Sequence, residues 1–211
     1  MLRIILLVSI LSVLHRQTEC VNKLSVHILY ESLCPDSIKF VNEQLYPVWR
    51  ELSPYVNIYF VPFGKSKSLD HGTSFVCQHG PKECLGNKIQ SCALNALIDQ
   101  NTQVDYVHCF MNIFKKNEDI NEMGQSCAEA VKLPWDYVLG CKNSPLGTQL
   151  QLTAETITAQ YSPKFVPTIL YDGHFHQQAQ DDSLVNFRGV VCGFLQQRLP
   201  NACSSYTAIQ I

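Results

Sequence analysis

Ten cysteines in a chain of 211 residues constrain the fold more than any other feature of this sequence. Such a density is typical of proteins that fold in an oxidising compartment and are stabilised by disulfides. Six of the ten lie between residues 64 and 147, so we expect this stretch to be held together by disulfides. The full set is Cys20, Cys34, Cys77, Cys84, Cys92, Cys109, Cys127, Cys141, Cys192 and Cys203.

The first twenty residues have the pattern of a secretory signal peptide. Arg3 precedes an apolar run that ends at Leu14, and Thr18 and Cys20 stand at the small-residue places of a cleavage site. The run is shorter than the roughly 17–25 residues that cross a bilayer, although a retained signal anchor is an alternative. We therefore expect a signal peptide at 1–20, no membrane span after its cleavage, and a secreted protein or one in an endosomal or lysosomal lumen.

The parity of the cysteines bears on chemistry. Cleavage after Cys20 leaves nine, of which eight can form four bridges while one stays a free thiol. Cleavage before Cys20 would allow five bridges and no free thiol. The sequence does not determine which cysteines pair.

The order of the expected elements indicates the fold class. Residues 24–30 and 56–62 alternate as strands, and apolar residues recur at helical spacing between them, from Ile38 to Leu52. Such a strand–helix–strand unit is typical of parallel strands. Short helical patterns follow at 84–97, 104–114 and 123–131, and a further helix at 148–161.

The C-terminal part predicts two more strands and a helix. A proline-led strand and turn span residues 164–173, a short return strand spans 174–177, and Asp181, Asp182 and Ser183 are expected to cap the last helix. The whole is an α/β (α+β) chain with a thioredoxin-like sheet, flanking helices and a disulfide-rich helical insertion. We place this domain at 21–203, its insertion at about 64–147 and a C-terminal tail at 204–211.

Cys34 is the predicted reactive residue. It stands where the first strand gives way to a helix, with Pro35 at the first helical position, which proline favours. The free N–H groups and the positive end of the helix dipole there favour thiolate over thiol, whereas Asp36 would oppose this if it pointed inward. Ser37, one turn later, can donate its hydroxyl to the sulfur. The alternative is a structural cysteine, bridged or buried and inert.

Ser37 also limits the chemistry, because it occupies the place of the second cysteine in a Cys-x-x-Cys motif. Serine cannot release a mixed disulfide, so an external low-molecular-weight thiol or a substrate thiol must do so. Val166–Pro167 is the expected partner of this site: a cis-proline here would leave backbone groups free to bind a peptide substrate. An ordinary trans proline in a loop is the alternative, since cis is found at only about 5–6% of such bonds.

Residues 77–92, CQHGPKECLGNKIQSC, carry a resemblance to a known family. They match the signature of the gamma-interferon-inducible lysosomal thiol reductases, C-Q-H-G, two residues, E-C, two residues, N, four residues, C. The matching residues are Cys77, Gln78, His79, Gly80, Glu83, Cys84, Asn87 and Cys92. The chain is most similar in its length to compact insect-type members, but its CPDS sequence at Cys34 differs from the family's two-cysteine motif.

The resemblance implies reduction of protein disulfides in endosomes, lysosomes or outside the cell, with a role in host defence and immunity. It implies protein or peptide disulfides as substrates and no bound cofactor. Family members are often N-glycosylated and sorted through mannose 6-phosphate, but this chain has no Asn-x-Ser/Thr site, which favours secretion. The net charge of −2, without a basic block, argues against nucleic acid as a partner.

Several alternatives remain open from the sequence. Cys77, His79, Cys84 and Cys92 could bind zinc, but tight cysteine pairs are absent, so we predict disulfides and no metal site. His174 and His176 are expected to be exposed loop residues, with proton donation to a leaving thiolate as the alternative.

Two functions compete with each other. The first is a thiol oxidoreductase, reductase-like or isomerase-like. The second is a degenerate binding protein that captures cysteine-bearing peptides without turnover. A purely structural secreted protein is a third possibility.

Overall fold

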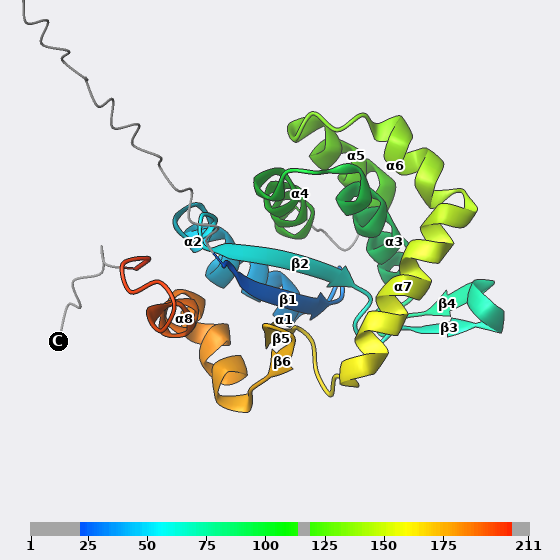
Figure 1. Ribbon diagram of the computed structural model, residues 1–211. Coiled ribbons are helices and arrows are strands. Elements are labelled where there is room, and N and C mark those ends of the chain that lie inside the picture. Colours follow the sequence, from blue (N-terminus) through cyan, green and yellow to red (C-terminus); the bar gives the residue numbers. More distant parts are fainter. Residues whose placement is uncertain (1–21, 114–118, 204–211) are drawn as a thin grey trace, which may run out of the picture.

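A four-stranded mixed sheet forms the centre of the molecule (Figure 1). The computed structural model describes residues 22–113 and 119–203. The strands β1 (Leu24–Tyr30), β2 (Val56–Pro62), β5 (Thr168–Tyr171) and β6 (His174–Phe175) lie in the order β2-β1-β5-β6. β1 is parallel to β2 and antiparallel to β5, so the predicted parallel pair is confirmed.

Successive side chains of β1 point to opposite faces of the sheet, and both faces are covered by other elements. Leu24, Val26, Ile28 and Tyr30 point into the largest buried cluster, whereas Leu29 belongs to a cluster on the other face. Helices α1 (Pro35–Lys39), α2 (Tyr46–Leu52) and α8 (Gln177–Gln196) cover the first face, together with a π-helical segment at Phe40–Leu45. Helix α7 (Pro145–Tyr161) covers the second face through residues such as Ala154 and Ile157.

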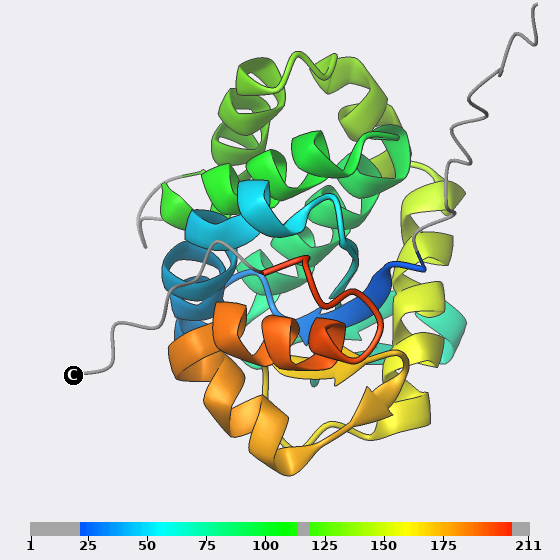
Figure 2. The same ribbon diagram turned by 60° about the vertical axis from the view of Figure 1, so that its left-hand side comes forward.

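The region between β2 and α7 is mainly helical, as predicted. It contains α3 (Pro81–Ala96), α4 (Gln100–Asn112), α5 (Ile120–Ala130) and α6 (Trp135–Lys142), which form a lobe beside the sheet (Figure 2). A two-stranded hairpin of β3 (Lys67–Leu69) and β4 (Ser74–Val76) projects from its start. The sequence does not reveal this hairpin or α6, because the strands are only three residues long and α6 buries only Val138.

The last helix begins earlier than the sequence suggests. Its N-cap is His176, not the Asp181–Ser183 segment, which lies inside α8. The first turn is supported by side-chain hydrogen bonds from Gln177 to Asp181 (2.8 Å) and from Gln178 to Asp182 (3.0 Å). Asp181 and Asp182 therefore accept hydrogen bonds from residues four positions earlier in the helix and do not cap its start, as the sequence had suggested.

The expected signal peptide at 1–20 and tail at 204–211 lie outside the described residues. The boundaries of the insertion at about 64–147 stay a prediction. Within the residues that the structure describes, no helix combines the length and the apolar character needed to cross a membrane.

Candidate active site at Cys34

Cys34 holds the position that the sequence predicts for it, as the N-cap residue of α1 with Pro35 next in the helix. Its backbone is extended (φ −68°, ψ 123°), and its carbonyl accepts the first helical hydrogen bond from Ile38 N at 2.9 Å. The strand β1 ends four residues earlier, at Tyr30. The chain therefore delivers the sulfur to the junction between a central strand and a helix N-terminus.

Cys34 is also the one described cysteine that forms no disulfide. The expected arrangement of four bridges and a free thiol is confirmed for the described residues, whereas Cys20 lies outside them. The bridges are Cys77–Cys84, Cys92–Cys141, Cys109–Cys127 and Cys192–Cys203.

The free sulfur lies against the predicted proline loop. Val166–Pro167 is a cis peptide bond, and Cys34 Sγ lies 3.7 Å from the carbonyl oxygen of Val166. Cys34 and Val166 are 6% and 7% exposed, so the thiol is in a recess rather than on an open surface. The structure thus brings together two segments that are 132 residues apart in sequence.

Ser37 is completely buried beneath this site, in the first helix after Cys34. Among the described residues its hydroxyl oxygen has no hydrogen-bond partner, so the donation to Cys34 that its position allows is not formed here. Asp36 is exposed to solvent.

A buried glutamine of α8, which sequence reasoning missed, holds the proline loop in place. Gln180 Nε2 donates to the carbonyl of Pro167 at 3.0 Å, and its Oε1 accepts from Ile169 N at 2.8 Å. The side chain therefore takes the place of a neighbouring strand beside the start of β5. Its sequence signal is weak, because a glutamine on a helix is usually exposed.

The loop that leads to Cys34 is fastened to α3 by the residues of the signature. Asn87 Oδ1 accepts from Ser32 N at 2.8 Å, and Ser32 Oγ donates to the Glu83 carbonyl at 3.2 Å. All three residues are buried. The helix approaches closely here, since a Cβ added at Gly86 would lie 2.5 Å from Ser32 Oγ. The matching motif thus positions the active-site loop, a role that its spacing alone does not reveal.

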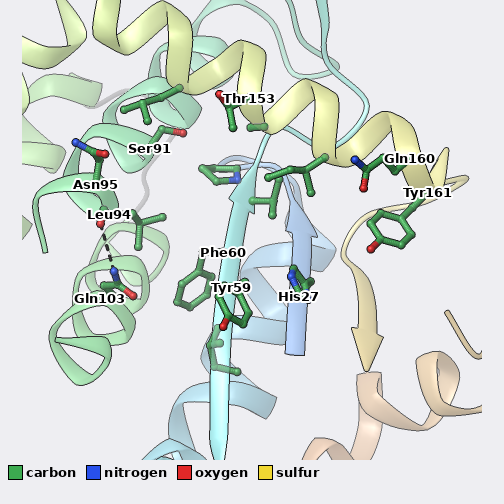
Figure 3. Close-up of a pocket in the computed structure, with 16 residues that line it drawn as sticks. His27, Tyr59, Phe60, Ser91, Leu94, Asn95, Gln103, Thr153, Gln160 and Tyr161 are labelled. Atoms are coloured by element: carbon green, nitrogen blue, oxygen red, sulfur yellow. Dashed lines mark hydrogen bonds between the residues drawn. The ribbon is translucent and has the colours of Figure 1, made fainter. Parts of the chain in front are cut away.

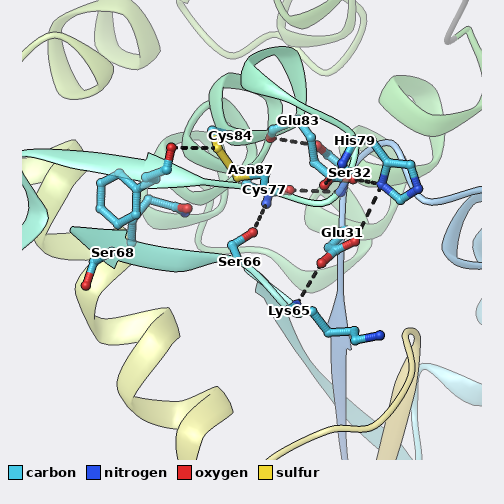
Figure 4. Close-up of a disulfide and its surroundings, with 12 residues drawn as sticks. Glu31, Ser32, Lys65, Ser66, Ser68, Cys77, His79, Glu83, Cys84 and Asn87 are labelled. Atoms are coloured by element: carbon cyan, nitrogen blue, oxygen red, sulfur yellow. Dashed lines mark hydrogen bonds and ion pairs between the residues drawn. A yellow bond between two sulfur atoms is a disulfide. The ribbon is translucent and has the colours of Figure 1, made fainter.

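His79 and the side chain of Glu83 form a polar cluster with Glu31 (Figure 4). His79 Nδ1 lies 2.6 Å from Glu83 Oε2 and 3.6 Å from Glu31 Oε2. Burial, reinforced by the nearby Glu83 carboxylate, raises the pKa of Glu31 to about 7, although Lys65 N donates to its Oε1 at 2.7 Å.

The rest of the signature shapes the segment that carries His79. Gly80 caps α3 with φ +86° and ψ −172°, a backbone conformation that is essentially restricted to glycine. Cys77 and Cys84 close this turn as a disulfide, and Cys92 joins α3 to Cys141 of α6. These three cysteines are therefore not zinc ligands. Gln78 is exposed.

The two C-terminal histidines behave as surface residues. His174 lies in β6 and His176 caps α8. Both are exposed, as the sequence predicts.

A cavity of about 440 Å³ lies elsewhere, between the sheet and helices α3 and α7 (Figure 3). His27 of β1 and Tyr59 of β2 stack on the sheet face that forms its floor, with ring centroids 4.6 Å apart. Neither Cys34 nor Pro167 lines it, so the candidate site at Cys34 is separate from this cavity.

Comparisons with known proteins identify the family of the chain. The profile of the family described as "Gamma interferon inducible lysosomal thiol reductase (GILT)" matches residues 25–131. A GILT-like protein of Drosophila melanogaster is 36% identical over 199 residues, covering 87% of this chain and 80% of its own length. A gamma-interferon-inducible lysosomal thiol reductase-like protein of Anopheles gambiae is 36% identical over 185 residues, covering 81% of this chain and 76% of its own length.

Solved structures establish the fold more broadly. A putative protein disulfide isomerase from Nitrosomonas europaea superposes with a TM-score of 0.58 at 13% identity, covering 83% of this chain and 99% of that one. BdbD from Bacillus subtilis superposes with a TM-score of 0.55 at 12% identity, covering 76% and 87%. The α/β, thioredoxin-like fold with a disulfide-rich helical region is confirmed. The family match and the placement of its signature beside Cys34 lead to one conclusion: the chain is a thiol oxidoreductase that belongs to the gamma interferon inducible lysosomal thiol reductase family.

Proposed function

We propose that Cys34 performs thiol–disulfide exchange on disulfides of proteins or peptides. Its thiolate attacks one sulfur of the substrate disulfide, forms a mixed disulfide and releases the other substrate sulfur as a thiolate. The observation that carries this proposal is the position of the unpaired sulfur, at a helix N-terminus and 3.7 Å from the Val166 carbonyl of the cis-proline loop.

Ser37 determines how the cycle ends. A serine cannot attack the mixed disulfide, so a second thiol from solution or from the substrate must attack it and return Cys34 to the thiol state. With two low-molecular-weight thiols the balance is complete: one substrate disulfide is reduced to two thiols, and the two external thiols leave as their own disulfide. With an internal substrate thiol the result is isomerisation without net reduction. Neither route requires a bound cofactor.

The surroundings of the cis-proline loop support a peptide substrate. Val166 and Pro167 are proposed to bind it, and a cavity of about 250 Å³ next to them is lined by Phe165, Thr168 and Phe175 among others. Phe165 and Phe175 are 36% and 42% exposed, with ring centroids 6.0 Å apart. Such a surface accepts an apolar side chain near the cysteine of an extended peptide.

The cellular setting is part of this proposal. The signal-peptide pattern and the four disulfides support a secreted protein or one in the endosomal or lysosomal lumen. The relatives named above are described as lysosomal thiol reductase-like or GILT-like, which supports the lysosomal setting and a reductase-type activity. A role in host defence is the part of the proposal that only the family resemblance implies.

The competing function is capture of cysteine-bearing peptides without turnover, which the buried Ser37 favours because it leaves the adduct unresolved. Mass spectrometry of the mature protein mixed with a disulfide peptide separates the two. Both functions give an adduct at Cys34, and Cys34→Ser should abolish it. Only the exchange enzyme should release reduced peptide catalytically when glutathione is added. A stable adduct that glutathione fails to turn over would assign the chain to the capture function.

Ser37→Cys tests how the mixed disulfide at Cys34 is resolved. A second cysteine one turn after Cys34 should resolve the mixed disulfide internally and raise the rate of peptide reduction at limiting glutathione. Ser37→Ala is the matched control, since it removes the hydroxyl without adding a thiol and should leave the rate near that of the parent. An unchanged rate for Ser37→Cys would contradict the assignment of position 37.

A further inference from the structure

Three side chains from two parts of the chain converge behind the loop that leads to Cys34. Glu31 follows β1, His79 precedes α3, and Glu83 lies in the first turn of α3. Their ligand atoms all lie within 4.8 Å of one another. Figure 4 shows the His79 ring beside the two carboxyl groups, with dashed lines to both, while the Lys65 side chain points away from them.

One carboxylate oxygen of Glu31 has no hydrogen-bond partner among the described residues. Its Oε1 accepts from Lys65 N, but among the described residues its Oε2 makes no hydrogen bond, although Glu31 is 0% exposed. Oε2 points into the cluster, 3.6 Å from His79 Nδ1. A buried carboxylate oxygen without a donor is costly unless a proton or another cation occupies the space beside it.

The charge of the cluster also favours a bound cation. Glu31 and Glu83 are both fully buried, and the partner they share is a single histidine whose side chain is 38% exposed. Two carboxylates and one imidazole carry a net negative charge even when the imidazole is protonated. Burial, reinforced by the Glu83 carboxylate, raises the pKa of Glu31.

We propose that Glu31, His79 and Glu83 form a binding site for a divalent transition-metal ion, with Zn²⁺ as the best fit. One imidazole nitrogen and two carboxylate oxygens are ligands that Zn²⁺ accepts, and three protein ligands leave a fourth position for water. The proposal departs from the sequence expectation of no metal site, and it uses none of the cysteines.

The distances suit this ion after a small movement. Two ligands of a tetrahedral zinc ion with bonds of about 2.0–2.1 Å lie roughly 3.3 Å apart. The 3.6 Å separation of His79 Nδ1 and Glu31 Oε2 is close to that value, whereas the 2.6 Å contact of Nδ1 with Glu83 Oε2 must widen. The proton in that contact is the one that the metal displaces.

The site would act on the loop and not on the reacting sulfur. The Glu31 carbonyl accepts from Cys34 N at 3.3 Å, so an ion held by Glu31 and the start of α3 would tie the Cys34 loop to the helical region. The inference goes beyond the proposed exchange reaction and does not depend on it, because metal binding requires no turnover at Cys34.

Isothermal titration of the mature chain with Zn²⁺ tests the proposal, and Co²⁺ absorption reports on the geometry. We expect one ion per chain, with a tetrahedral Co²⁺ spectrum that lacks sulfur-to-metal charge transfer. Glu31→Gln and His79→Gln should each weaken Zn²⁺ binding by more than about 100-fold, since loss of an outer partner alone costs 10–100-fold.

Two variants serve as controls in the same titration. Cys34→Ser removes the free thiol, and the double variant His174→Gln/His176→Gln removes the exposed histidine pair. Both should bind Zn²⁺ as the parent does. Failure of the parent to bind, or binding that survives Glu31→Gln and His79→Gln, would overturn the proposal. Because Cys34→Ser has no exchange activity by design, this result is separate from the fate of the proposed reaction.

Discussion

The sheet region and the helical region of this molecule are held together by different means. The sheet, α1, α2 and α8 share one large apolar cluster that includes Val26, Ile28, Trp49 and Phe187, with a single disulfide near the C-terminal end. The helical region has a smaller cluster and three disulfides, two of which join separate helices.

This difference matters because the proposed reaction needs a reductant. The free sulfur sits in the region whose stability is mainly apolar, whereas most structural disulfides lie in the other region. Helix α4 of the helical region packs into the large cluster through Val104, Val107 and Met111, and Asn87 and Glu83 of α3 hold Ser32, two residues before Cys34. Damage to the helical region is therefore expected to reach the active site through this junction, and four predictions test the comparison.

The largest effect is expected from the bridge that links α3 to α6. Cys92→Ser/Cys141→Ser opens a bridge between residues 49 apart, which should lower the free energy of unfolding by about 4 kcal/mol. Hydrogen exchange should show the loss in α3 and α6 before β1 and β2. Cys192→Ser/Cys203→Ser, which opens a bridge between residues 11 apart, is the control and should cost less. Equal loss of protection in both regions would show that they unfold as one unit.

The second prediction concerns pH and Glu31. Its folded pKa of about 7 exceeds the ordinary value of 4.5, so the folded state binds more protons between these values and stability should fall as pH rises from 4.5 to 7. Glu31→Gln should remove this slope and raise the free energy of unfolding at pH 8 by up to about 3 kcal/mol. Urea unfolding with EDTA present measures this, with exposed Glu43→Gln as the control. A parallel pH dependence in both variants would contradict it.

The third prediction breaks the junction itself. Asn87→Ala leaves the buried N–H of Ser32 without its acceptor, which should cost about 1–3 kcal/mol. The peptide-reduction rate should fall along with stability, because the loop that carries Cys34 loses its attachment to α3. Asn95→Ala, an exposed position on the same helix, should change neither quantity. A normal peptide-reduction rate in a destabilised Asn87→Ala protein would show that the attachment of Ser32 to α3 affects stability but not the reaction.

The smallest effect is expected at Gly80. An added Cβ would meet no atom within 4 Å, so the cost of Gly80→Ala comes from the backbone at φ +86° alone and should be about 1–3 kcal/mol, without a change in the peptide-reduction rate. Gly140→Ala, in α6 and also without close neighbours, should instead be neutral or stabilising. Thermal unfolding of the two variants compares them directly.

Local patterns made much of this fold predictable. Alternation in residues 24–30 and 56–62 predicted β1 and β2, and Cys34 before Pro35 predicted the N-cap of α1. The hairpin β3–β4 and helix α6 were not predicted, because three-residue strands and a helix with one buried side chain have no apolar periodicity. The predicted start of α8 was wrong, because Asp181, Asp182 and Ser183 were taken for its N-cap.

The sequence by itself determined the family and the serine that replaces a resolving cysteine, because both depend on residue identity, whereas it left open whether any thiol stays free. Only the tertiary structure decided how the eight described partners pair and which groups meet across the chain. The contact of Cys34 with Val166, the bonds of Gln180 to the proline loop and the convergence of Glu31 with His79 join residues far apart in the chain. Spacing along a chain sets local conformation, whereas the packing of helices on both faces of the sheet sets which distant side chains touch.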